Sequence, residues 1–212
     1  MAAKAGKIVL PELGRKGAYV LRNRAALLKS TQEVLADIGP VATIDDIADH
    51  SQMSVSTIYK HFENKETLFA AAIGASFADW ESWKNEITKD LKDELEQLVI
   101  PMRLFLRLKT THPHYAQMVA KNFESIAMIV PALGNEMALH VNRLVKSKVL
   151  QIDDVPLRIA NLMAILAAAL RSRLLDPKFS AADADGSIKI GLVMLGISEA
   201  KLKKLFDQKL PI

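Results

Sequence analysis

A short polar stretch, Thr43–Lys65, carries side chains that suit contact with a polyanion. From Ser54 to His61 it holds hydroxyl groups, one lysine and one histidine, and no carboxylate appears before Glu63. Nucleic-acid phosphates attract cations and hydrogen-bond donors and repel carboxylates. The stretch is therefore a candidate nucleic-acid-binding segment.

Other patterns of reactive side chains are weak. His112 and His114 lie two residues apart around Pro113, so they do not share a helical face, and a metal site is not expected there. The sequence contains no cysteine, nucleophile elbow, phosphate-binding glycine loop or HExxH pattern. We therefore expect no enzyme, no metal site and no cofactor.

Helical periodicity supplies the elements that position the polar stretch. Apolar residues fall on one face of the segment 22–38, which Gly39-Pro40 ends. Two short helices are predicted at about 43–50 and 55–62, joined by a turn of about four residues. Thr43, with Asp46 three residues later, is predicted to cap the first of them, and Ser54 the second. The pattern predicts a helix-turn-helix whose second helix enters the DNA major groove.

This region resembles the DNA-binding domain of the TetR (tetracycline repressor) family of bacterial transcriptional regulators. The resemblance covers about residues 22–77 and is most specific at Tyr59-Xaa-His61-Phe62-Xaa-Xaa-Lys65. The other matching residues are Thr43, Ile47, Ala48, Ser54, Thr57, Ile58 and Leu68. Gln52 occupies a turn position that is usually glycine in the family, because the turn needs a left-handed backbone. A non-glycine residue there costs roughly 1–2 kcal/mol.

Roles in DNA binding are expected for each polar position. Thr43 and Ser54, at the two helix starts, are expected to bind phosphates. The residues expected at base edges are Val55, Ser56, Thr57 and Lys60. The resemblance implies that Tyr59 and His61 contact the backbone and that Lys65 clamps a phosphate. For Tyr59 the alternative is a core aromatic with an exposed hydroxyl.

Basic residues are concentrated at the N-terminus. The chain has a net charge of +4, and residues 1–30 hold seven bases and one acid, which leaves the remainder at −2. Residues 1–21 are expected to form a flexible basic arm, because glycines flank its central Arg15-Lys16 pair. The residues expected to reach adjacent phosphates or the minor groove are Arg15, Lys16, Arg22 and Arg24. The alternative is an arm that is only solvated.

The rest of the chain also favours helices, and the predicted fold class is all-α. Residues 22–78 are expected to form the helix-turn-helix domain and 79–212 a larger helical domain. Further helices are predicted at about 64–78, 114–125, 131–150, 155–175, 182–195 and 198–208. The apolar run Ile159–Leu170 is shorter than the roughly 20 residues of a membrane span, and no signal segment is recognised. A cytoplasmic protein is therefore expected.

The predicted C-terminal domain contains two candidate contact regions. Segment 155–175 is apolar nearly all round and needs cover on several sides, and the resemblance implies a homodimer through 155–175 and 182–195 that reads a palindromic operator. Methionine and aromatic side chains between the helices are expected to form a pocket for a small-molecule effector. The residues expected in it are Met102, Phe105, Tyr115, Met118, Asn122, Phe123 and Met163. For each of them the alternative is an ordinary core position.

Together these patterns predict a DNA-binding transcriptional regulator, and a ligand-responsive repressor in particular. The alternative is a helical ligand-binding or protein-interaction module without sequence-specific DNA binding, and Gln52 is the feature that favours it. An enzyme built on a helical bundle is a third possibility that no motif supports.

Overall fold

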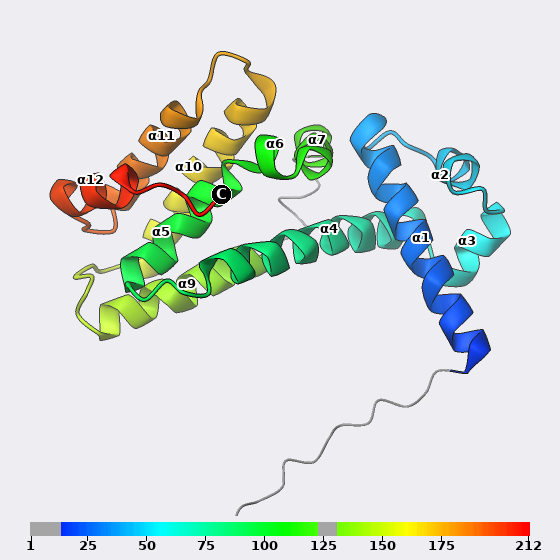
Figure 1. Cartoon of the computed structure of the whole chain (residues 1–212), viewed down its shortest axis with the longest axis horizontal. Coiled ribbons are helices and arrows are strands. Elements are labelled where there is room, and N and C mark those ends of the chain that lie inside the picture. Colours follow the sequence, from blue (N-terminus) through cyan, green and yellow to red (C-terminus); the bar gives the residue numbers. More distant parts are fainter. Residues whose placement is uncertain (1–13, 123–130) are drawn as a thin grey trace, which may run out of the picture.

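The computed structural model describes residues 14–122 and 131–212, and in those residues it contains α-helices and turns but no strand. The predicted all-α fold class is confirmed. The helices form two groups that α4 (Lys65–Thr88) connects (Figure 1). The smaller group consists of α1 (Arg15–Asp37), α2 (Ile44–Ser51) and α3 (Val55–His61). The larger group consists of α5 (Glu94–Phe105), α6 (Leu108–Thr111), α7 (Pro113–Lys121), α9 (Pro131–Lys146), α10 (Val155–Leu175), α11 (Ala181–Val193) and α12 (Glu199–Asp207).

The smaller group has its own apolar core, to which α1, α2, α3 and the start of α4 contribute. The buried residues of this core are Leu27, Val34, Ala42, Ile47, Ala48, Ile58, Phe62 and Leu68. The predicted caps are present. Thr43 and Asp46 form a reciprocal capping box on α2, and the Ser54 hydroxyl accepts the Thr57 N–H on α3. Because α2 and α3 are short, this shared core rather than helix propensity keeps them folded.

Two helices are longer than the sequence predicted. α1 begins at Arg15 instead of residue 22, so residues 15–21 are helical and do not belong to a flexible arm. The reason is that Ala18–Leu21 contains no strong helix breaker, and extending an existing helix adds one hydrogen bond per residue. α4 runs to Thr88, so the domain boundary predicted after residue 78 falls inside a continuous helix. Residues 1–13 of the predicted arm lie outside the described residues.

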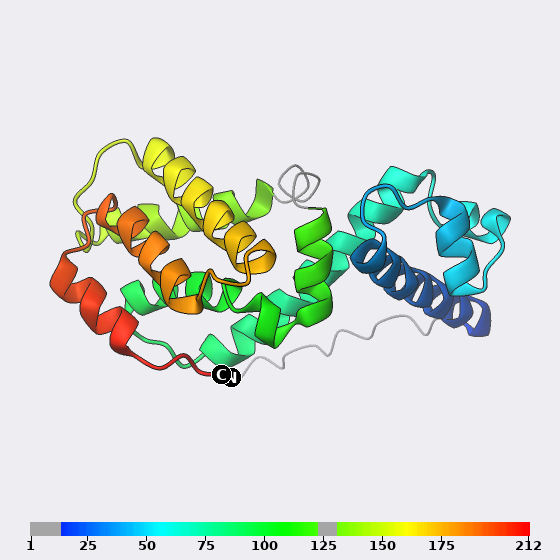
Figure 2. The ribbon, with the colours of Figure 1, turned by 90° about the horizontal axis from the view of Figure 1, so that it is seen from above.

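The larger group surrounds a second core, in which α10 and α11 pack side by side (Figure 2). Gly191 permits their close approach, because a Cβ at this position would lie 2.7 Å from Leu162 Cδ1. Among the described helices, α10 is long and apolar enough to cross a membrane, although only 28% of its most apolar window is buried. The run Ile159–Leu170 therefore belongs to a 21-residue helix that meets the length criterion. A single helix of this length and composition is weak evidence for a membrane span.

A buried ion cluster fixes α11 and the C-terminal segment to α5. Asp185 on α11 accepts hydrogen bonds from Arg103 Nε at 3.2 Å and from Arg107 Nη2 at 2.8 Å. Arg103 also donates from Nη1 to the carbonyl oxygens of Leu205, at 3.0 Å, and Gln208, at 3.1 Å. The cluster places two positive charges around one carboxylate, and the exposed fractions of the three side chains are only 6%, 13% and 12% for Arg103, Arg107 and Asp185.

Candidate nucleic-acid interface

The turn between α2 and α3 keeps a helix-turn-helix geometry without glycine. Gln52 has φ 55° and ψ 33°, the left-handed conformation that the sequence analysis expected at this position. The N–H of Gln52 donates to Asp49 O at 3.3 Å, and the N–H of Met53 donates to Ala48 O at 3.1 Å. These bonds satisfy backbone carbonyl groups at the C-terminal end of α2. They also hold Gln52 in its left-handed conformation.

The first turn of α3 presents a cluster of hydroxyl groups to solvent. Ser54 Oγ lies 3.0 Å from Ser56 Oγ and 2.8 Å from Thr57 Oγ1, and it accepts the Thr57 N–H at 3.2 Å. Ser54 and Ser56 are exposed, Thr57 is half-buried, and Val55 packs partly against the small core. The structure therefore brings together the residues predicted for base and phosphate contact at the start of α3.

The remaining predicted residues of α3 also face outward. Lys60 is exposed, His61 is half-buried and Tyr59 is 51% exposed, whereas Ile58 between them is buried in the small core. The alternative that Tyr59 is a core aromatic is therefore wrong. Because residues one position apart on a helix point in different directions, burying Ile58 turns its neighbours toward solvent.

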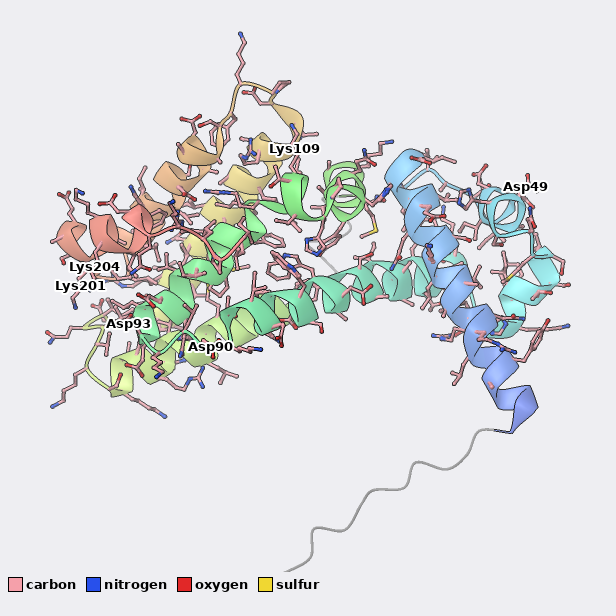
Figure 3. All side chains as sticks on the ribbon, in the orientation of Figure 1. Asp49, Asp90, Asp93, Lys109, Lys201 and Lys204 are labelled. Carbon is pink, nitrogen blue, oxygen red and sulfur yellow. The ribbon has the colours of Figure 1, made fainter. Side chains whose placement is uncertain are left out.

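Three acidic residues of this group lie on α2, next to the turn that leads to α3. Asp45 and Asp49 are exposed there, and Figure 3 labels Asp49 on this helix. The Asp46 carboxylate accepts hydrogen bonds from the Thr43 hydroxyl and backbone N–H, both at 2.7 Å, and these bonds lower the pKa of Asp46. The Thr43 hydroxyl therefore caps α2 beside a negative charge. α3 has no carboxylate, so it is better suited than α2 to approach DNA phosphates.

Two of the predicted cations also hold the helix-turn-helix together. Arg24 donates from Nη1 to His61 O at 2.9 Å, and its guanidinium carbon lies 4.0 Å from the centroid of the Phe62 ring. Lys65 Nζ donates to Ala42 O at 2.9 Å, just before α2. The sequence did not indicate either structural contact, because neither is local in the chain. An ammonium group has three donors, so Lys65 retains capacity for a phosphate.

The other predicted basic residues lie on the extension of α1. Arg22 is exposed on its outer surface. Arg15 and Lys16 lie in the first turn of α1, and their side chains are outside the described part of the structure. Arg24 thus ties α1, which carries Arg22, to the end of α3.

The residues predicted for effector binding lie mostly in the larger core. Met102, Tyr115 and Met118 are buried in it, and Phe105 and Met163 are half-buried against it, whereas Phe123 lies outside the described residues. Such positions are compatible both with a pocket wall and with ordinary packing. Burial raises the pKa of the Tyr115 hydroxyl, so this group is neutral.

Asn122 has a structural role that the sequence did not indicate. It is 3% exposed, and its Nδ2 donates to Leu35 O of α1 at 3.1 Å and to Met118 O of α7 at 2.9 Å. Lys121 Nζ donates to Asp37 O at the C-terminal end of α1. The bond to Leu35 O therefore joins the end of α7 to α1, the bond to Met118 O holds Asn122 to its own helix, and the two helix groups meet here as well as through α4.

The comparisons with known proteins agree with this geometry. Residues 27–72 match the sequence model described as bacterial regulatory proteins, tetR family. A structure of RolR (NCGL1110) in complex with resorcinol is similar in fold, with a TM-score of 0.73 and 18% identity, over 92% of this chain and 98% of that one. FadR from Bacillus subtilis in complex with stearoyl-CoA gives a TM-score of 0.67 and 15% identity, over 80% and 98%.

A further structure of similar fold is NalD, the secondary repressor of the MexAB-OprM multidrug efflux pump in Pseudomonas aeruginosa. Its TM-score is 0.61 at 16% identity, over 84% of this chain and 97% of NalD. No curated protein sequence matches the chain. At these identities the structural similarities show the fold, and the family model characterises the helix-turn-helix. Residues 27–72 thus match the tetR family of bacterial regulatory proteins, and the chain is similar in fold to these solved structures.

Proposed function

We propose that this protein is a ligand-responsive transcriptional repressor that acts in the cytoplasm and binds a palindromic operator as a homodimer. The observation that carries the proposal is the outward face of α3. It combines a hydroxyl cluster at its N-terminal turn with Lys60 and has no carboxylate. A helix of this kind fits the major groove, where hydroxyl and lysine side chains read base edges.

The proposed DNA contacts divide into two classes. Val55, Ser56, Thr57 and Lys60 read base edges, whereas the backbone contacts come from Thr43, Ser54, Tyr59, His61, Lys65 and the basic residues of α1. Residues 22–78 act as the DNA-binding domain and 79–212 as the effector and dimerisation domain. The alternative function without DNA binding loses its main support, because Gln52 adopts the left-handed conformation that the turn requires.

An apolar surface on α10 and α11 supports the proposed dimer. Leu157 and Leu175 at the two ends of α10 are 56% and 54% exposed, and Ile190 and Val193 on α11 are 67% and 50% exposed. Large exposed apolar side chains on two adjacent helices are compatible with a subunit interface. A two-fold axis through this surface gives two α3 helices for the two halves of a palindrome.

The contact between α7 and α1 supports a response to ligand. An effector that binds the larger core with different affinity in two packings shifts their populations. Because Asn122 and Lys121 join α7 to the end of α1, a displacement of α7 alters the position of the DNA-binding group. RolR and FadR were each solved with a small molecule bound. Their folds support an effector role for the corresponding domain here.

The two classes of DNA contact are distinguished by replacing Lys65 and Lys60 separately by alanine. Lys65→Ala should weaken binding to every duplex by about ten-fold and reduce the slope of log affinity against log salt by about one, because one phosphate contact is lost. Lys60→Ala should relax the preference at one base position, with a cost of about 1–3 kcal/mol on the preferred sequence only. Fluorescence anisotropy with matched operator and point-substituted duplexes measures both. Uniform losses for both variants across all duplexes would refute the division.

A further inference from the structure

Arg24 on α1 holds the C-terminal end of α3 from outside that helix. The N-terminal half of α1 passes the end of α3 (Figure 1). Arg24 Nη1 donates to the carbonyl oxygen of His61, the last residue of α3, at 2.9 Å. Its guanidinium carbon lies 4.0 Å from the centroid of the ring of Phe62, which is 6% exposed and belongs to the core of the smaller group. One side chain therefore contacts both the end of α3 and the core residue that follows it.

The C-terminal end of α3 benefits from such a contact. α3 has seven residues, and a helix this short is not stable through its own hydrogen bonds. Ser54 caps its start, whereas its end is followed by Phe62 in an extended conformation instead of the left-handed residue that ends many helices. The last carbonyl groups of a helix have no partner inside it and carry a partial negative charge. The guanidinium of Arg24 therefore satisfies His61 O and favours the helix dipole at the same time.

The contact also bears on the direction in which α3 points. Within α3, Ile58 is fully buried and Val55 packs partly against the small core. Apolar packing is not directional, whereas a charge-assisted hydrogen bond has a defined geometry. Lys60, which is proposed to read a base edge, directly precedes His61. The bond from Arg24 therefore fixes the part of α3 that carries Lys60 relative to α1.

The chemistry of the contact distinguishes it from a phosphate contact. Arg24 is half-buried, and its guanidinium is engaged by a carbonyl group and an aromatic face, whereas Arg22 on the same helix is exposed. Lysine binds a phosphate as a point charge, but it lacks the planar, forked group that donates and stacks at once. Replacement by lysine is therefore tolerated at a phosphate contact and not at the position of Arg24.

We propose that Arg24 is a positioning residue that sets the orientation of α3 in the major groove and so determines sequence discrimination. The inference rests on the proposed DNA-binding function and assigns this residue a role different from the backbone contacts of the other basic residues of α1. When α3 is less fixed, a smaller fraction of molecules presents its outward face correctly, and the apparent affinity for the operator falls with that fraction. Non-specific binding depends on phosphates and is not affected in this way.

The test compares Arg24→Lys with Arg22→Lys as the matched control, because both substitutions keep the net charge. The duplexes are the palindrome that the wild-type full-length protein selects and a scrambled duplex of the same length. Arg24→Lys should bind the palindrome about ten-fold more weakly, as when about one molecule in ten is competent, and should bind the scrambled duplex as the wild type does. Arg22→Lys should leave both affinities unchanged. Fluorescence anisotropy measures these affinities.

Hydrogen exchange of the free full-length proteins tests the hold on α3 without DNA. The Phe62 N–H donates to Ile58 O at 3.0 Å and reports on the last turn of α3, and the Leu68 N–H donates to Asn64 O at 3.2 Å and reports on the start of α4. Arg24→Lys should speed exchange at Phe62 by about ten-fold through local opening and leave Leu68 unchanged. Arg22→Lys should exchange as the wild type does at both positions.

If the wild type discriminates between the duplexes and Arg24→Lys does so equally well, the inference is overturned and the proposed function stands. Faster exchange throughout α1 to α4 would also overturn the inference, because Arg24 would then support the whole helix group instead of α3. If the wild type binds no duplex, the proposed function fails, and exchange at Phe62 alone decides whether Arg24 holds α3.

Discussion

Asp185→Asn should lower the free energy of unfolding by about 3–5 kcal/mol, because it leaves two buried arginines without a counter-charge. Arg103 and Arg107 donate three side-chain hydrogen bonds to this carboxylate, at 2.8 to 3.2 Å, and Arg103 Nη2 lies 3.2 Å from the same carboxylate. Arg103 is 5% exposed and also carries the C-terminal segment through Leu205 and Gln208. The loss should therefore loosen α12 as well as α11. Urea unfolding at fixed protein concentration measures the change.

The matched control for this prediction is Asp207→Asn. Asp207 forms an ion pair with Lys203 at 2.5 Å, but both side chains are largely exposed, so its loss should have little measurable effect. A second test replaces the whole cluster through Arg103→Met, Arg107→Met and Asp185→Leu, which should recover most of the lost stability. Similar unfolding midpoints for Asp185→Asn and Asp207→Asn would show that the buried cluster does not stabilise this fold.

If the proposed dimer forms through α10 and α11, Ile190→Asp should convert it to monomers and reduce affinity for a palindrome by about 100-fold or more. Ile190 is the most exposed of the apolar residues on α10 and α11, at 67%. Burial of a carboxylate in the interface costs desolvation free energy, which disfavours the dimer. A monomer also loses the avidity of binding two linked half-sites, which typically increases affinity by about 10²–10⁴-fold. Light scattering after size exclusion measures the mass, and anisotropy measures the affinity.

Leu139→Asp is the matched control for the dimer prediction. Leu139 on α9 is also 67% exposed and apolar, but it lies away from α10 and α11 in the sequence. It should remain a dimer with unchanged affinity. A dimeric Ile190→Asp variant, or a monomeric Leu139→Asp variant, would place the subunit interface elsewhere.

The helix-turn-helix was predictable because its signals are local. Thr43 and Ser54 begin α2 and α3 through hydrogen bonds to residues three positions later, and Gln52 marks a turn whose geometry depends on its own backbone. The bounds of α10 were predicted correctly for the same reason. Asp154 caps its start next to Pro156, and Asp176-Pro177 follows its end.

The contacts that the sequence did not predict join distant segments. Arg24 meets the carbonyl of His61 37 residues later, and Asp185 meets Arg103 82 residues earlier. No periodicity or cap specifies such pairs, because the packing of several helices determines them.

The start of α1 was also predicted wrongly from the local composition. The glycines and basic residues around Arg15 suggested a flexible arm, whereas α1 continues through this region. Arg24 anchors this arrangement through the end of α3 and the Phe62 ring.

The central claim is that α3 reads a specific DNA sequence as one half of a symmetric pair. The most direct measurement is selection of bound duplexes from a random library by the full-length protein, followed by sequencing. We expect an enriched inverted repeat with half-sites separated by about one helical turn or more. The enrichment at single positions should change with Lys60→Ala. Recovery of duplexes with no common sequence, or of a single half-site without symmetry, would contradict the account.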